Sequence, residues 1–224
     1  MEEKIIEVEG VSKDFGKIKA LKDVSFYLKN GEIICILGEN GSGKSTLIKI
    51  IAGIIKPTDG KLKIFGKDPF KERSIYSKIG FLFHEPLFYE ELTIFENLYF
   101  ISKVLNVENF FEKIKKISSL FLIEDKLNEK VKNLSRGEIQ KAGFLRALLN
   151  DPEILILDEP FTAVDEKGKE IIIKVFNDFK KEKKSIIFST HDKEIAKNIS
   201  DNVLLLSKGK KIYFGNLKNF LNFC

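Results

Sequence analysis

The segment GENGSGKS, residues 38–45, constrains the fold of this chain more than any other feature. It begins at Gly38, the last residue of the apolar run EIICILG, and is followed after Thr46 by a segment, LIKIIAGII, in which apolar residues recur at helical spacing. The preceding run is apolar enough for a strand that is buried on both faces, as in a parallel sheet. A glycine-rich turn from strand to helix fits the pattern G-x-x-x-x-G-K-[ST], whose backbone N–H groups surround a phosphate. The segment therefore predicts an α/β fold with an anion site at the start of this helix.

Strand-like runs lie on both sides of this first helix. KIIEVEG and VSFYLKN precede the glycine-rich segment, and KLKIFG and KIGFLF follow the helix. Each has the apolar content of a strand. We expect Pro57 and Gly60 to end the helix and turn the chain, because proline cannot continue a helix and glycine accepts turn conformations.

The middle of the chain changes to a helical pattern, from Thr93 to about Leu149. Strands are expected again in EILILD and SIIFST, with a helix between them, and VLLLSKG with KKIYFG predicts a hairpin before a short last helix. We interpret the chain as one domain in which an α/β core, residues 1–85 and 150–224, is interrupted by a helical subdomain, residues 86–149.

The composition is that of a soluble globular protein, with 43% hydrophobic and 32% charged residues. No run approaches about 18 apolar residues, so we expect no bilayer span, and the charged N-terminus does not resemble a signal peptide. Cys35 and Cys224 do not make a disulfide framework, which favours the cytosol. Only three of the 38 basic residues are arginines and the lysines are scattered, so we expect no nucleic-acid partner.

The glycine-rich segment offers several groups to a phosphate. Its glycines let backbone N–H groups turn inward, and the helix N-terminus adds its dipole. Lys44 supplies a mobile positive charge for the β- and γ-phosphates, and the hydroxyl of Ser45 can ligate Mg²⁺. The residues expected to bind the nucleotide here are Gly38, Asn40, Gly41, Ser42, Gly43, Lys44, Ser45 and Thr46. A glycine-rich turn with a surface lysine is the alternative.

Two further segments bring chemically active side chains to the same edge of the sheet. Asp158 ends the buried strand EILILD, where a carboxylate is costly unless it meets a cation, and a Mg²⁺ shared with Ser45 would satisfy it. Glu159 comes next, faces elsewhere, and could polarise an attacking water as a general base. His191 follows the strand SIIFST and can reach a γ-phosphate at the carboxyl edge of the sheet. Solvated acids at a strand end and a structural histidine are the alternatives.

These motifs together resemble those of the ATP-binding subunits of ATP-binding cassette (ABC) transporters. GENGSGKS resembles the Walker A motif, ILILDEP the Walker B motif, LSRGE the LSGGQ signature, FTAVD the D-loop and THD the switch histidine, all in the family order. The resemblance implies a P-loop NTPase core with a parallel sheet, an N-terminal antiparallel β subdomain and a helical insert. It also implies an ATPase that uses ATP and Mg²⁺, with Lys44, Glu159 and His191 as catalytic residues.

The resemblance further implies that two ATP-binding domains pair head to tail. The second domain would be another copy of this chain or a homologous subunit. Each ATP would lie between the glycine-rich segment of one copy and the signature of the other, where Ser135 and the N–H of Gly137 would reach the γ-phosphate. Asp165, in the segment that resembles the D-loop, would also belong to the ATP site. Ser135 and Glu138 additionally fit a capping box at a helix start.

Four positions in three motifs depart from the family pattern. Arg136 and Glu138 replace a glycine and a glutamine of the signature, and Arg136 adds a positive charge near the phosphates. His84 stands where the family has a glutamine that reaches Mg²⁺ and the attacking water. A neutral imidazole could ligate the metal and a protonated one could not, so we hypothesise slow or pH-sensitive hydrolysis. Phe15 is expected to stack on adenine in place of the usual tyrosine, with core packing as the alternative.

The resemblance implies a motor subunit that powers transport through a separate membrane permease, at the cytoplasmic face of the membrane. A groove between the core and the helical subdomain would receive short helices of that permease, and it would include Phe88, Tyr89, Leu92 and Phe95. The lack of a long C-terminal regulatory domain favours export. A soluble ABC ATPase of a cytosolic assembly system, such as iron–sulfur cluster assembly, is the alternative. A catalytically weak ATP sensor is a third interpretation, against which Glu159 and His191 argue.

Overall fold

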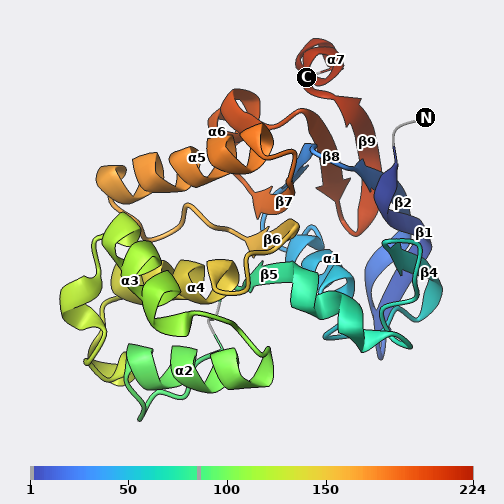
Figure 1. Ribbon diagram of the computed structural model, residues 1–224. Coiled ribbons are helices and arrows are strands. Elements are labelled where there is room, and N and C mark those ends of the chain that lie inside the picture. The colour runs from blue at the N-terminus through green and yellow to red at the C-terminus, as the bar shows by residue number, and fades with distance from the viewer. Residues whose placement is uncertain (1–2, 85–86, 224) are drawn as a thin grey trace.

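The computed structural model describes residues 3–84 and 87–223, and two sheets organise them (Figure 1). The larger sheet has the strand order β5-β6-β7-β3-β8-β9, and its neighbours are parallel except for β8 and β9. Its strands are β5 (Ile79–Leu82), β6 (Ile154–Asp158), β7 (Ser185–Thr190), β3 (Ile33–Leu37), β8 (Asn202–Ser207) and β9 (Lys210–Asn216). Because β6, β7 and β3 are parallel neighbours, the loops that follow them meet at one edge.

A smaller antiparallel sheet packs over one face of the larger one. It has the order β2-β1-β4, and its strands are β1 (Lys4–Phe15), β2 (Ile18–Lys29) and β4 (Asp59–Ile64). Helix α1 (Lys44–Ile51) contacts β6 and β7 of the larger sheet and β2 of the smaller one. One buried hydrophobic cluster includes Ile6 of the small sheet, Leu47 of α1 and Ile36 of the large sheet. Helix α1 is therefore packed against both sheets.

The remaining helices lie on the other side of the larger sheet, some against its strands and some against one another (Figure 1). They are α2 (Ile94–Val104), α3 (Phe110–Phe121), α4 (Arg136–Leu148), α5 (Glu166–Lys181), α6 (Lys193–Ile199) and α7 (Leu217–Phe223). Short 3₁₀ helices are Arg73–Lys78, Glu124–Lys126 and Val131–Asn133. Alternate residues of β3 face the two layers: Ile33, Cys35 and Leu37 join the helix side, whereas Ile34 and Ile36 join the side of α1. The fully apolar strand predicted before the glycine-rich loop is thus buried on both faces.

Helix α4 joins the helical segment directly to the sheet. A Cβ atom on Gly80 of β5 would lie 2.0 Å from the carbonyl oxygen of Ala147 in α4, so the two backbones are in close contact. Phe144 of α4 and Phe188 of β7 belong to one hydrophobic cluster. The core therefore continues from the sheet into α4.

The expected fold class is confirmed, but the end of the first helix was predicted wrongly. Helix α1 ends at Ile51, so neither Pro57 nor Gly60 ends it. The chain instead leaves the helix through Gly53, whose φ of 69° places it in the left-handed region.

Helix α6 was not expected. Its start is fixed by Asp192, whose carboxylate accepts the N–H groups of Glu194 and Ile195 at 2.8 and 3.3 Å. Only Ala196 of its seven residues is buried, so its apolar periodicity is too weak to predict a helix. None of the helices in the described part of the chain has the length and apolarity that a bilayer span requires.

Candidate functional site

The glycine-rich loop between β3 and α1 takes a path that requires glycine. Gly41 and Gly43 have φ values of 77° and 106°, in the region that side chains rarely adopt. At Gly38 a Cβ atom would come within 2.5 Å of the carbonyl oxygen of Leu206. No side chain caps the start of α1, so its first N–H groups are available to an anion.

The side chain of Lys44 is held inside the site. It is 6% exposed, and its Nζ donates to the carbonyl oxygens of Gly38 at 2.7 Å and Glu39 at 3.2 Å. Nζ also lies 3.4 Å from Oε1 of Glu159. In this structure two loop carbonyls and a carboxylate therefore surround the ammonium group.

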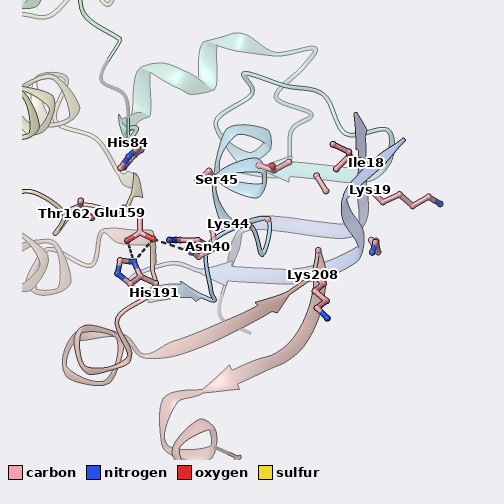
Figure 2. A pocket seen from close by; sticks show the side chains of 16 residues that line it. Ile18, Lys19, Asn40, Lys44, Ser45, His84, Glu159, Thr162, His191 and Lys208 are labelled. Atoms are coloured by element: carbon pink, nitrogen blue, oxygen red, sulfur yellow. Dashed lines mark hydrogen bonds and ion pairs between the residues drawn. The ribbon is translucent and has the colours of Figure 1, made fainter. Parts of the chain in front are cut away.

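A pocket of about 800 Å³ adjoins this loop (Figure 2). The loop and α1 contribute Asn40, Gly41, Gly43, Lys44, Ser45 and Thr46 to its lining. The lining also includes His84, Glu159, Thr162 and His191. Both of the two histidines in the chain therefore line one pocket. Its size suits a small-molecule ligand, and its glycine-rich backbone and lysine suit phosphates.

Strand β6 ends in two carboxylates with different surroundings. Asp158 is 1% exposed, and its Oδ1 accepts the hydroxyl of Ser189 at 2.5 Å. Glu159 has a φ of 51°, and its Oε2 lies 3.2 Å from Nδ1 of His191, so its carboxylate stands between that ring and Lys44 (Figure 2). Asp158 is suited to hold a cation and Glu159 to accept a proton from water.

A buried thiol lies near these charges without being able to react. The pKa of Cys35 is raised well above its ordinary value, first by burial and then by the negative charge of Glu159, while Lys44 opposes the shift. The thiol stays protonated, so it is not a nucleophile here. Cys224 lies outside the described residues.

Magnesium fits the side chains at the end of β6 and the start of α1. Ser45 lines the pocket with a hydroxyl, and Oδ2 of Asp158 has no hydrogen-bond partner among the described residues. His84 lines the same pocket. The described residues contain no group of three His, Cys, Asp or Glu side chains that could hold a metal ion. This donor set suits Mg²⁺, which usually takes one or two protein ligands and completes its shell with phosphates and water.

The signature segment LSRGE starts helix α4. Oγ of Ser135 accepts the N–H of Glu138 at 3.3 Å, and the Glu138 carboxylate accepts the N–H of Ser135 at 2.8 Å. This is the capping box expected from the sequence. The hydrogen bonds from Ser135 hold the pKa of the Glu138 carboxyl below its usual value.

The start of α4 faces a second pocket, separate from that of Lys44. This pocket has a volume of about 520 Å³, includes Arg136 in its lining, and shares His84 and Thr162 with the first. Neither Ser135 nor Gly137 lines the Lys44 pocket. Within one chain, the two expected phosphate sites are therefore not assembled around the same space.

Phe15 and Asp165 are also outside the lining of the Lys44 pocket. Phe15 is 48% exposed, which excludes core packing, and the ammonium of Lys13 lies 5.2 Å from its ring centroid. Its cross-strand partner Ile18 does line the pocket, so Phe15 stands next to the rim. The carboxylate of Asp165 accepts the N–H of Gly168 at 2.8 Å and thereby caps α5.

Sequence reasoning missed the lysines that line the pocket outside the glycine-rich loop. They are Lys19, Lys22 and Lys208. Backbone hydrogen bonds join the β1–β2 hairpin, the β8–β9 hairpin and the glycine-rich loop. The N–H of Lys22 donates to the carbonyl of Gly209 at 2.8 Å, and the N–H of Gly209 donates to the carbonyl of Ser42 at 3.0 Å. No local motif marks these lysines, because only the tertiary fold places the hairpins beside the loop.

Sequence comparisons point to one family. A family model described as ABC transporter matches residues 21–162. The ABC transporter ATP-binding protein NatA of Bacillus subtilis is 35% identical over 206 residues, which cover 90% of this chain and 84% of that protein. The sulfate/thiosulfate import ATP-binding protein CysA of Escherichia coli is 32% identical over 211 residues, covering 91% of this chain and 58% of that protein.

Structural comparisons agree with the sequence comparisons. An ATP-binding subunit of an ABC transporter superposes with a TM-score of 0.90 at 27% identity, covering 98% of this chain and 92% of that one. A dimeric ATP-binding cassette in a post-hydrolysis state, bound to ADP and phosphate, superposes with a TM-score of 0.79 at 30% identity, covering 95% of this chain and 98% of that one.

Proposed function

This chain belongs to the ABC transporter family as an ATP-binding subunit and an ATPase, and from that premise we propose that it drives transport through a separate membrane permease. The observation that carries the proposal is the arrangement of Lys44, Glu159 and His191 around one pocket. The permease would hold the chain at the cytoplasmic face of the membrane. Purification from gently solubilised membranes would test this, since the chain should then co-purify with a multi-span membrane protein.

The comparisons support neither the export direction nor the soluble assembly ATPase that the sequence left open. The relative CysA is described as an import protein, so the export direction expected from the sequence is not confirmed. The relatives reported above are described as transporter proteins, which does not favour a role in iron–sulfur cluster assembly. The proposal therefore leaves the direction of transport to the permease.

Nucleotide binding would begin by changing the partner of Lys44. In the structure its ammonium faces the carboxylate of Glu159 at 3.4 Å. Phosphates of ATP in the glycine-rich loop would supply a stronger anion and leave Glu159 free to accept a proton. We assign phosphate binding to Asn40, Gly41, Ser42, Gly43 and Thr46, together with Gly38 and Lys44. Phe15, next to the rim, would contact adenine.

Hydrolysis would then use five side chains of this chain. Ser45 and Asp158, with His84 as a third donor, would hold Mg²⁺, which supplies charge neutralisation at the β- and γ-phosphates when bound. Glu159 would take a proton from the attacking water, and His191, 3.2 Å from the Glu159 carboxylate, would contact the γ-phosphate. The carboxylate and the ring are both held at the edge of the sheet, so the water would meet a fixed base.

Two copies would complete each nucleotide site. Ser135 and Gly137 lie at the start of α4, outside the Lys44 pocket of their own chain, so they are placed to contact a nucleotide on a second molecule. Asp165 would lie at the same interface. A solved relative is described as dimeric with ADP and phosphate bound, which supports this arrangement.

Ser135 allows a test that preserves the helix cap. Asp and Asn are both good N-caps, so Ser135→Asp and Ser135→Asn should each fold. Only Ser135→Asp places a negative charge against the γ-phosphate of the other copy. We therefore expect Ser135→Asp to bind ATP but to lose the ATP-dependent dimer seen by light scattering, while Ser135→Asn keeps it. An Asp variant that dimerises as well as the wild type would contradict the two-copy site.

The permease would dock beside the second pocket. Three side chains that line a neighbouring hollow of about 350 Å³ are well exposed: Leu87 by 60%, Tyr89 by 61% and Phe100 by 50%. Phe88 lines the same hollow, and Phe95 packs partly against the core. We propose that the groove expected around Phe88, Tyr89, Leu92 and Phe95 extends to Phe100 and receives apolar segments of the permease.

Replacing His84 by glutamine tests its effect on the pH profile. His84 and His191 line the same pocket, and imidazole is the side chain that ordinarily changes charge between pH 5 and 8. We expect the wild-type rate of hydrolysis to fall by roughly three- to tenfold more than that of His84→Gln between pH 8 and 6, because a protonated ring cannot ligate a cation. Steady-state rates across this range provide the measurement. Superimposable profiles would show that His84 does not limit the rate.

A further inference from the structure

The backbone of Glu159 is strained. Its φ of 51° places a non-glycine residue in the left-handed region, directly after the last residue of β6. Such a conformation is unfavourable for a residue with a Cβ atom and persists only where surrounding contacts enforce it. The conformation matters because it turns the side chain of Glu159 away from that of Asp158 and toward Lys44 and His191.

A buried serine holds the N–H of Glu159. This N–H donates to Oγ of Ser189 at 3.0 Å, and the Ser189 hydroxyl donates in turn to Oδ1 of Asp158 at 2.5 Å. Ser189 is fully buried in β7, in register with Asp158 of β6. One hydroxyl therefore bonds to both acidic residues, accepting from the backbone of one and donating to the carboxylate of the other.

A buried glutamine holds the opposite side of the same residue. Nε2 of Gln140 donates to the carbonyl oxygens of Glu159 at 3.3 Å and Pro160 at 3.2 Å. Gln140 is 6% exposed and belongs to α4, the helix that Ser135 caps. The N–H and the carbonyl of Glu159 are thus each bonded by a side chain from a different element.

We propose that Ser189 and Gln140 are positioning residues for ATP hydrolysis, which together hold the Glu159 backbone so that its carboxylate faces the pocket. The proposal rests on the proposed role of Glu159 as the base. Ser189 ties this base to the residue that would hold the cation, so both carboxylates keep a fixed relation. Gln140 ties the base to the helix whose start would meet the other copy's nucleotide. Closure of two copies onto α4 would therefore act on the Glu159 backbone through Gln140.

Removing either side chain should lower turnover more than binding. In Ser189→Ala and Gln140→Met, the Glu159 backbone loses one partner, while the glycine-rich loop and Lys44 are unchanged. We expect kcat to fall by about 10- to 100-fold, since a misplacement near 1 Å can cost about 100-fold. The Kd for ATP should stay within roughly threefold of the wild type. Steady-state hydrolysis, normalised to the fraction of chain that binds a fluorescent ATP analogue, gives both quantities even where a variant folds incompletely.

Ser185 provides the matched control. It is also fully buried in β7, accepts the N–H of Gly31 at 2.8 Å and donates to the carbonyl of Lys29 at 3.3 Å. These contacts lie at the other end of the strand. Ser185→Ala should therefore lower the unfolding temperature about as much as Ser189→Ala does, yet keep kcat within about twofold. The conservative variant Ser189→Thr keeps the hydroxyl and should recover most of the lost kcat.

The double variant distinguishes one shared effect from two unrelated ones. Because both side chains act on one peptide segment, Ser189→Ala with Gln140→Met should lose less kcat than the product of the two single losses. Full multiplicativity, a normal kcat in Ser189→Ala, or an equal loss in Ser185→Ala would each overturn the inference. Failure of the proposed function is a separate result: Glu159→Gln would then hydrolyse ATP at the wild-type rate.

Discussion

Glu159→Gln is expected to lower the rate of ATP hydrolysis by about 10²- to 10⁴-fold while ATP still binds. An amide has nearly the same shape as the carboxylate but cannot accept a proton from water. The binding groups are untouched, because Lys44 keeps its contacts with the carbonyls of Gly38 and Glu39. The change also removes the negative charge that faces Lys44 at 3.4 Å, so affinity for ATP should be equal or higher.

Single-turnover phosphate release and ATP titration would measure these two effects separately. Glu153→Gln is a suitable control, because Glu153 precedes the opposite end of β6 and its carboxylate pairs with Lys78 on the surface. Its rate should stay within about twofold of the wild type, as expected for an exposed ion pair. A Glu159→Gln variant with wild-type turnover would remove Glu159 from the reaction and leave His191 as the remaining candidate.

Gly80→Ala is expected to destabilise the fold by about 3 kcal/mol. A Cβ atom at this position would lie 2.0 Å from the carbonyl oxygen of Ala147 and 2.7 Å from a methyl carbon of Leu155. The first of these atoms belongs to the backbone of α4, so the helix must move away from β5. Urea unfolding followed by circular dichroism would give the free energy of unfolding, and ATP hydrolysis would fall with it, since α4 carries both Ser135 and Gln140.

Gly143→Ala tests the same interface from the side of α4. Its added methyl would meet Cδ1 of Leu82 at 2.4 Å, which is the end of a side chain that can rotate. Alanine also gains up to about 1 kcal/mol over glycine within a helix. We therefore expect the free energy of unfolding to change by no more than about 1 kcal/mol. Equal losses in the two variants would indicate that general crowding, and not the approach of the two backbones, sets the stability of this interface.

The parts of the fold that could be predicted are those with strong local signals. GENGSGKS predicts a turn from a strand into a helix, and the structure places it between β3, which ends at Leu37, and α1, which begins at Lys44. The end of α1 was missed because Gly53 leaves the helix before Pro57 is reached. Helix α6 was missed because its start depends on one Asp192 cap and little apolar periodicity.

The sequence motifs likewise predicted only some of the residues of the site. The motifs located Lys44, Glu159 and His191, but no spacing rule identifies Ser189 or Gln140. Each is a single polar residue, and its importance depends on strand register and helix packing that arise only in the folded chain. The tether on Lys44 could not be foreseen either, since it uses backbone carbonyls that every residue carries.

Because both histidines line one pocket, their side chains can serve as probes of what that pocket contains. Selective isotope labelling of histidine would give an NMR spectrum in which the ring signals of this protein come from the nucleotide pocket alone. The resonance of the ring at position 191 would respond to changes at the adjacent carboxylate. The resonance of the ring at position 84 would respond to changes where the first pocket adjoins the second. Arrival of nucleotide and its later cleavage could thus be followed by resonance position, without attaching any dye.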